Sequence, residues 1–271
     1  MVVMVHANSQ VVTACQLVSL RMMKNKPVIE CRDLKKSFGN KTVLQDINLT
    51  VYDGSVLALV GSNGAGKTTL LKILATLITP TGGRACICGN DVLLQPHRVQ
   101  KSMGFVSSEE RSFYWRLTGR QNLDFFAALH GIAGRERKET IENLLKKMGH
   151  DEERNKRFRE YSSGMKQVLC IIRAMLHDPP VLLLDEPTKS LSPDVAKRVR
   201  GIVGSAVKDH GKTVVIASHN LHEVEDIADH IVIMDHGVIK AGGSIKELRM
   251  QRGVSPSSNL DRIFEYYTGK G

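Results

Sequence analysis

Aromatic residues are scarce in this chain of 271 residues, since Phe, Trp and Tyr make up 5% of it and Trp occurs once. This low content weakens the case for an aromatic platform on which bases stack. Acidic residues are outnumbered too, with 28 Asp and Glu against 38 Lys and Arg, a formal net charge of +10. Such a surface favours phosphorylated ligands, anionic lipid headgroups or nucleic acid, and does not choose among them.

Cysteine is sparse, with five residues at positions 15, 31, 86, 88 and 170. The count is odd and no CxxC pair occurs, which argues against a disulfide framework and against a zinc site. The spacing of Cys86 and Cys88 predicts a strand that carries both thiols on one face. Reduced cysteines of this kind indicate a cytoplasmic protein.

Long apolar runs are missing, and no stretch approaches the roughly 20 residues that a membrane helix needs. Polar residues interrupt the segment 1–26, and its first basic residues, Arg21 and Lys24, follow its apolar part, whereas a signal peptide carries them before it. We expect residues 1–26 to be a non-essential extension. The 42% of hydrophobic residues suffices for a sizeable core in the rest of the chain.

From Pro27 onward, short apolar runs alternate with turn residues and with helical spacing. Strands are predicted at 28–34, 43–51, 55–60, 181–184, 213–218 and 231–234, and helices at 67–77 and over most of 117–177. Alternating strands and helices in the last third are typical of a parallel sheet covered on both faces. The helical stretch between two strand-rich parts suggests two lobes.

The strongest motif, Gly-Ser-Asn-Gly-Ala-Gly-Lys-Thr-Thr at 61–69, fits GxxxxGK[ST] and lies between a predicted strand and a predicted helix. Glycines let backbone N–H groups turn toward phosphate oxygens, and the helix N-terminus adds a positive dipole end. We expect Lys67 to reach the β- and γ-phosphates and Thr68 to hold Mg²⁺. The predicted ATP-binding residues of this loop are Gly61, Ser62, Asn63, Gly64, Ala65, Gly66, Lys67, Thr68 and Thr69.

Two carboxylates follow a buried apolar strand in Val-Leu-Leu-Leu-Asp-Glu-Pro at 181–187. Asp185 is expected to ligate Mg²⁺, and Glu186 is expected to be the general base for attack on the γ-phosphate. A strand that ends in two exposed acids is common by itself. Its pairing with the loop at Lys67 favours the nucleotide site.

A third segment, Tyr-Ser-Ser-Gly-Met-Lys-Gln at 161–167, opens a predicted helix with small polar residues and glycine. This pattern is typical of an anion-binding corner, and a serine N-cap explains it equally well.

Taken in their order along the chain, the motifs at 61–69, 161–167 and 181–187, followed by Ile-Ala-Ser-His-Asn at 216–220, resemble the ATP-binding-cassette (ABC) ATPases. The resemblance covers about residues 27–245. It implies an α/β P-loop NTPase with a RecA-like parallel-sheet core, an antiparallel β subdomain and a helical subdomain at about 105–178, followed by a tail at 246–271. It also implies an ATPase that uses ATP and Mg²⁺.

The resemblance assigns further residues. Phe38 resembles the aromatic that stacks on adenine, although a core Phe is the alternative. Ser162, Ser163 and Gly164 resemble the signature that contacts the ATP held by a second cassette. His219 resembles the histidine that contacts the γ-phosphate beside the catalytic Glu186, whereas a lone His is more often structural.

The signature variant and the ending at 260–269 resemble ATPases of drug, lipid, polysaccharide or ion exporters. For the ending, an amphipathic terminal helix is an equal alternative. This branch implies a separate transmembrane permease, a second copy of the chain or a paired cassette, and a peripheral position on the cytoplasmic face of the membrane. The helical insert is the expected docking surface for the permease.

Three positions depart from the family pattern, and one of them, Ser163 where many members carry glycine, is tolerated in this signature variant. Ser108 or Glu109 stands where the family has a glutamine that contacts Mg²⁺, and Ser192 stands where it has an aspartate at the dimer interface. We expect a competent ATPase, at a reduced rate. The alternatives are a soluble cassette that acts on ribosomes or nucleic acid, and a regulatory module that binds nucleotide without hydrolysis. No nucleic-acid partner is expected, because such cassettes carry additions that this sequence lacks.

Overall fold

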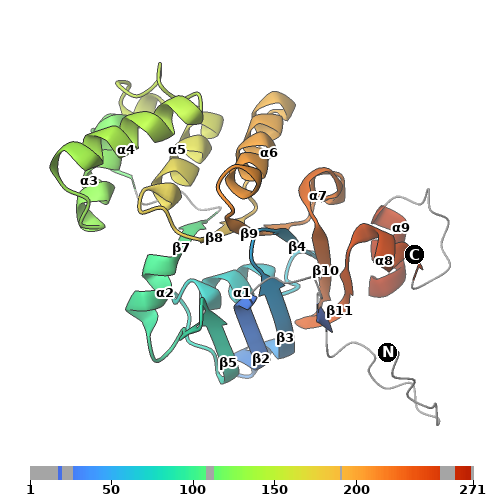
Figure 1. Cartoon of the computed structure of the whole chain (residues 1–271). Coiled ribbons are helices and arrows are strands. Elements are labelled where there is room, and N and C mark those ends of the chain that lie inside the picture. Colours follow the sequence, from blue (N-terminus) through green and yellow to red (C-terminus); the bar gives the residue numbers. More distant parts are fainter. Residues whose placement is uncertain (1–17, 20–26, 108–112, 190, 251–259, 270–271) are drawn as a thin grey trace, which may run out of the picture.

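The computed structural model describes residues 18–19, 27–107, 113–189, 191–250 and 260–269. Within these residues the chain forms a six-stranded sheet, a five-stranded sheet and helices that cover them (Figure 1). The predicted α/β fold, with a parallel core, an antiparallel sheet and a helical part, is confirmed.

The six-stranded sheet is mostly parallel. Its order is β11 (Val238–Gly243), β10 (His230–Asp235), β4 (Val56–Val60), β9 (Thr213–Ser218), β8 (Val181–Asp185) and β7 (Met103–Val106). Only the β10–β11 pair is antiparallel among the pairs described. Every residue of β4, β8, β9 and β10 is buried, as expected for strands covered on both faces.

The two faces of this sheet pack against different layers, because successive side chains of a strand point to opposite faces. Leu57 and Leu59 of β4 pack with α1 (Lys67–Leu74) and with the smaller sheet. Ala58 and Val60 pack with α7 (Leu221–Ile227), α8 (Ile245–Met250) and α9 (Leu260–Thr268).

The smaller sheet flanks α1 on the side away from the larger sheet (Figure 1). Its order is β1 (Val18–Ser19), β3 (Lys41–Tyr52), β2 (Pro27–Phe38), β5 (Gly82–Ile87) and β6 (Asn90–Asp91). Its pairs are antiparallel except β1–β3. Helix α2 (Pro96–Ser102) follows and leads into β7.

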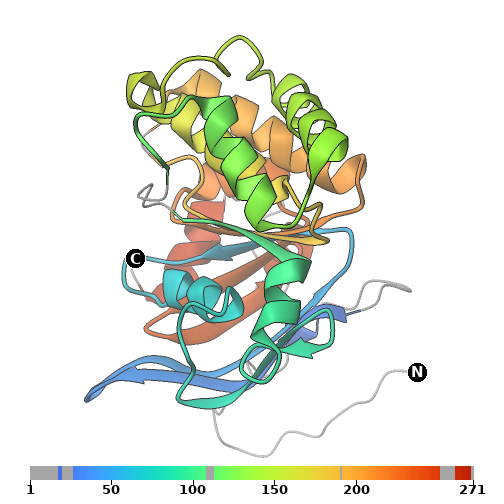
Figure 2. The ribbon, with the colours of Figure 1, turned by 90° about the vertical axis from the view of Figure 1, so that its left-hand side faces the viewer.

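The remaining helices gather at the opposite end of the molecule, as Figures 1 and 2 both show. They are α3 (Gly119–Leu129), α4 (Gly134–Lys147), a 3₁₀ turn at Phe158–Glu160, α5 (Ser163–Met175) and α6 (Pro193–Lys208). Their core contains a stack of Phe113 on Phe158, with ring centroids 4.6 Å apart. The same cluster continues onto β8 through Leu182 and Leu184, so this part is joined to the sheet by apolar packing.

Three local predictions were wrong. The helix at 67–77 ends at Leu74, because Thr76 has φ +61° and the chain turns there. Cys86 lies in β5, but Cys88 follows its end with φ +50°, so the two thiols do not share a strand face. The helical part begins after β7, since residues 103–106 belong to the parallel sheet. In the part of the chain described above, none of the helices has both the length and the apolar character to span a bilayer.

Candidate functional site

Most of the predicted site residues lie at the ends of three neighbouring strands of the parallel sheet or directly after them. Strand β9 lies between β4 and β8, with Val60 opposite Ser218 and Asp185 opposite Ala217. The carboxyl ends of the three strands therefore meet at one edge, where open α/β sheets bind ligands. This register brings the loop after Val60, the carboxylates at the end of β8 and the segment after Ser218 together.

The phosphate-loop motif is packed so closely that glycine is required. A Cβ on Gly61 would lie 2.4 Å from the carbonyl oxygen of Met234. Gly66 has φ +101°, and a Cβ there would lie 2.7 Å from Cδ2 of Leu44. The loop thus rests on the start of β3 and the end of β10, directly before α1.

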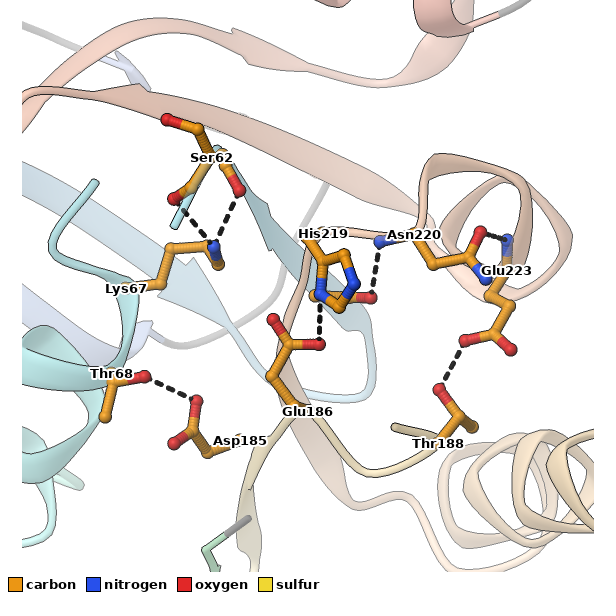
Figure 3. Close-up of polar contacts among 11 residues, drawn as sticks. Ser62, Lys67, Thr68, Asp185, Glu186, Thr188, His219, Asn220 and Glu223 are labelled. Carbon is orange, nitrogen blue, oxygen red and sulfur yellow. Dashed lines mark hydrogen bonds and ion pairs between the residues drawn. The ribbon is translucent and has the colours of Figure 1, made fainter. Parts of the chain in front are cut away.

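Lys67 is the buried cation of this loop. Its Nζ donates hydrogen bonds to the carbonyl oxygens of Gly61 at 2.7 Å and Ser62 at 3.2 Å (Figure 3). Burial lowers the pKa of the Lys67 ammonium, and the nearby carboxylates of Glu186 and Asp185 act in the opposite direction. The amine is held at the mouth of the loop, where phosphate oxygens can replace the carbonyls.

The Thr68 hydroxyl donates to Oδ1 of Asp185 at 2.9 Å, which joins the phosphate loop to β8. Asp185 is 1% exposed, and its Oδ2 is buried without a hydrogen-bond partner. Burial raises the pKa of the Asp185 carboxyl, while the Thr68 hydrogen bond lowers it. An unpartnered buried carboxylate oxygen beside a hydroxyl oxygen is a donor set that suits a hard cation such as Mg²⁺.

No group of three or more His, Cys, Asp or Glu side chains converges as a metal site among the described residues.

Glu186 and His219 form the second half of the site. Nδ1 of His219 lies 2.7 Å from Oε2 of Glu186, so an Nδ1–H donates to the carboxylate (Figure 3). Glu186 has φ +51°, a strained conformation for a residue with a side chain, and its N–H donates to the carbonyl of Ala217 at 2.9 Å. Backbone strain of this kind concentrates at functional sites.

Phe38 ends β2 and is 49% exposed, which excludes the alternative of a core phenylalanine. The Nζ of Lys36 lies 4.5 Å from the centroid of its ring. An exposed ring beside a cation is suited to stack on a base.

The signature residues open α5, and no hydrogen bond or ion pair among the described residues joins them to the phosphate loop. Ser162 is the N-cap of α5, its hydroxyl accepting from the N–H of Met165 at 3.2 Å, and both Ser162 and Ser163 are exposed. A Cβ on Gly164 would lie 2.8 Å from Cγ1 of Val195 on α6. The N-cap role expected for Ser162 is therefore present, and it leaves an anion-binding role open.

Of the positions that depart from the family pattern at 108–109 and at Ser192, the structure describes only Ser192. Ser108 and Glu109 lie outside the described residues. Ser192 is the N-cap residue of α6 and makes no side-chain capping bond, with Pro193 and Asp194 in the first turn.

Sequence reasoning missed a set of side chains beside the site. The Thr188 hydroxyl donates to Oε2 of Glu223, and the Glu223 N–H donates to Oδ1 of Asn220, the N-cap of α7, at 3.4 Å. An Asn followed three residues later by Glu is a recognisable helix start, so this signal was available in the sequence.

With this geometry in place, comparison with known proteins identifies the family. Residues 44–189 match the family described as ABC transporter. The chain belongs to the ABC transporter family. As a member of it, the protein is an ATPase that binds ATP and serves a transporter.

Relatives of this ABC ATPase cover most of its length. It is 33% identical to "ABC transporter ATP-binding protein NatA" of Bacillus subtilis (strain 168), over 82% of this chain and 91% of the relative. It is 38% identical to "Bacitracin transport ATP-binding protein BcrA" of Enterococcus faecalis, over 84% and 72%. It is 34% identical to "Daunorubicin resistance ATP-binding protein DrrA3" of Streptomyces coeruleorubidus, over 81% and 69%.

Solved structures show the same fold. An "ATP binding subunit of ABC transporter" superposes with a TM-score of 0.80 at 27% identity, over 89% of this ABC ATPase and 99% of that chain. A dimeric ATP-binding cassette in a post-hydrolysis state with ADP and Pi superposes with a TM-score of 0.73, over 80% and 98%. Its 22% identity makes it a likeness of fold alone.

Proposed function

We propose that this ABC ATPase binds Mg²⁺-ATP between two cassettes and powers export through a separate permease. The observation that carries the proposal is the meeting of Lys67, Thr68, Asp185, Glu186 and His219 at the carboxyl edge of β4, β9 and β8. That edge contains a phosphate cradle, a cation ligand pair and a candidate general base within one hydrogen-bonded neighbourhood.

Each residue has a role that its contacts support. The phosphate loop, residues 61–69, binds the triphosphate through its backbone N–H groups and Lys67. Phe38 stacks on the adenine. Glu186 accepts the proton of the attacking water, and His219 orients Glu186 and contacts the γ-phosphate.

Mg²⁺ would be held by Thr68 and Asp185, whose hydroxyl and unpartnered carboxylate oxygen fit it. When bound, the ion neutralises charge on the β- and γ-phosphate oxygens. The Asp185 carboxylate stays close to the loop because Thr68 donates to it, so ligand and phosphate cradle are positioned together.

The signature completes the site from a second chain. Ser162 and Ser163 are exposed at the N-terminus of α5, a helix of 13 residues, and within the described part of the chain no hydrogen bond or ion pair joins them to their own phosphate loop. Helix N-termini favour anions. In a head-to-tail pair, each α5 would therefore approach the γ-phosphate held by the partner's loop.

The relatives support the proposed transport direction and the proposed permease partner. Their names include bacitracin transport and daunorubicin resistance, which fit an exporter of drug-like molecules. The helical part that follows β7, up to about residue 178, would dock on the permease, with the ATPase at the cytoplasmic face of the membrane. A cassette for ribosomes or nucleic acid, and a module without hydrolysis, are both less favoured, the second because Glu186 and His219 are in contact.

Mixing two inactive variants tests the shared site. Lys67→Met removes the phosphate contact of every site in its own dimer, and Ser162→Arg blocks every signature in its own dimer. A mixed dimer contains one site with both parts intact, so an equal mixture should regain roughly a quarter of the wild-type rate, from half the dimers and half their sites.

Lys67→Met mixed with a double variant that carries both changes is the control, because no intact site can form. Activity in this control, or no recovery in the test mixture, contradicts a site shared between two chains.

A further inference from the structure

Three side chains outside the proposed nucleotide site meet at the first turn of α7, beside the loop that follows Glu186. Thr188 lies two residues after Glu186, Glu223 lies four residues after His219, and Arg200 comes from α6. We call Thr188, Glu223 and Arg200 the Glu223 cluster. Figure 3 shows Thr188 and Glu223 beside the catalytic pair.

The Glu223 carboxylate is held from both sides. Its Oε2 accepts from the Thr188 hydroxyl, and its Oε1 lies 3.3 Å from Nη1 of Arg200. The side chains of Glu223 and Arg200 are each 19% exposed. Hydrogen bonds to a charged carboxylate that is largely buried are stronger than hydrogen bonds between neutral groups at the surface.

Both ends of the cluster continue into the catalytic segments. On one side, the N–H of Lys189 donates to the carbonyl of Glu186 at 3.1 Å. On the other, the Glu223 N–H donates to Asn220 Oδ1, and the Asn220 N–H donates to Ser218 Oγ at 3.0 Å. The cluster therefore joins the loop after β8 to the loop after β9.

We propose that Thr188 and Glu223 are positioning residues for ATP hydrolysis, acting through the distance between Glu186 and His219. This rests on the proposed roles of those two residues. Glu186 sits in a strained left-handed conformation, so the direction of its side chain depends on what holds the loop after it. The Thr188–Glu223 hydrogen bond fixes that loop against α7, and the ion pair of Arg200 with Glu223 joins α7 to α6.

Thr188→Val tests the proposal, since it removes the hydroxyl and keeps the shape of the side chain. The cluster predicts that kcat for ATP falls about 10-fold while KM stays within about 2-fold, because misplacement affects chemistry more than binding. Thr188→Ser keeps the hydroxyl and should restore kcat. Glu225→Ala is the matched control, because Glu225 lies on the same helix and pairs with Arg249 at 2.9 Å, outside the cluster.

Hydrogen exchange supplies a readout that needs no turnover. Thr188→Val should speed amide exchange at residues 219–224, which lie on the other side of the Thr188–Glu223 contact within the same chain. Thr188→Ser and Glu225→Ala should leave exchange at those amides unchanged. Unchanged exchange at 219–224 in Thr188→Val overturns the proposal.

Glu186→Gln separates this proposal from the proposed function. If Glu186→Gln removes activity and Thr188→Val does not lower kcat, the positioning role fails and the catalytic roles stand. If Glu186→Gln retains full activity, the catalytic roles themselves fail.

Discussion

At the residue scale, Gly66 meets two constraints in one position, a φ of +101° and a site where a Cβ would lie 2.7 Å from Leu44 and 3.0 Å from the carbonyl of Val43. Gly66→Ala should therefore destabilise the protein by about 2 kcal/mol or more and weaken ATP binding at least about 10-fold, since the loop must shift to admit the methyl group. Thermal unfolding and a fluorescent-nucleotide titration measure the two effects.

Gly201→Ala is the matched control, because Gly201 lies inside α6 and a Cβ there would meet nothing within 4 Å. Alanine is the better helix former, so this variant should gain about 0.5–1 kcal/mol. Wild-type ATP affinity in Gly66→Ala would contradict the packing argument.

Phe38 allows adenine recognition to be separated from phosphate recognition. Its exposed ring is not part of the core, so Phe38→Ala should leave the fold intact. Loss of base stacking should weaken ATP binding about 5- to 30-fold. Competition by inorganic triphosphate should be unchanged, and Phe38→Trp should bind ATP as the wild type does. An equal loss for ATP and triphosphate would show that Phe38 supports the loop instead.

Sequence motifs predict a contact when both residues bind the same ligand or act in the same reaction. The proximity of Thr68 to Asp185 and of Glu186 to His219 was expected from their motifs, and both pairs are in contact. The Arg200–Glu223 pair was not expected, because a surface-type arginine and glutamate give no sign of which charge they meet across the fold.

At the element scale, strand predictions were accurate where burial is complete. The segments 181–184 and 213–218 are fully apolar or small and match β8 and β9. The sequence did not predict where a helix or strand ends at a residue with positive φ, as at Thr76 after α1 and at Cys88 after β5. Positive φ in residues other than glycine is set by tertiary contacts, which a local pattern does not contain.

The segment between α4 and α5 gives a prediction about pH. His150 is 1% exposed, and burial, assisted by the charge of Arg198 and opposed by Glu153, lowers its pKa to about 4. As pH falls from about 7 to about 4, the unfolded chain binds a proton at His150 before the folded chain does, so the free energy of unfolding decreases by about 3 kcal/mol.

His150→Leu should remove that share of the pH dependence, as measured by urea unfolding at about pH 7 and about pH 4. His177, whose pKa burial also lowers to about 4, should account for part of what remains. An identical pH dependence in His150→Leu and wild type would contradict the assignment.

At the scale of the whole molecule, the helical part and the antiparallel sheet lie at opposite ends, with the parallel sheet between them (Figures 1 and 2). The phosphate loop precedes α1, which lies on the face of the parallel sheet toward the smaller sheet, while the signature opens α5 on the other face. One chain thus carries the proposed phosphate loop and the proposed signature on different parts of its fold. This separation is the structural reason to expect two cassettes acting together.

The most direct test of that expectation is the rate of ATP hydrolysis per chain as a function of protein concentration, with Glu186→Gln measured alongside. A shared site predicts a rate per chain that rises with concentration and a loss of about 100-fold or more in Glu186→Gln. A rate per chain that is independent of concentration and survives Glu186→Gln would contradict both the shared site and the role of Glu186.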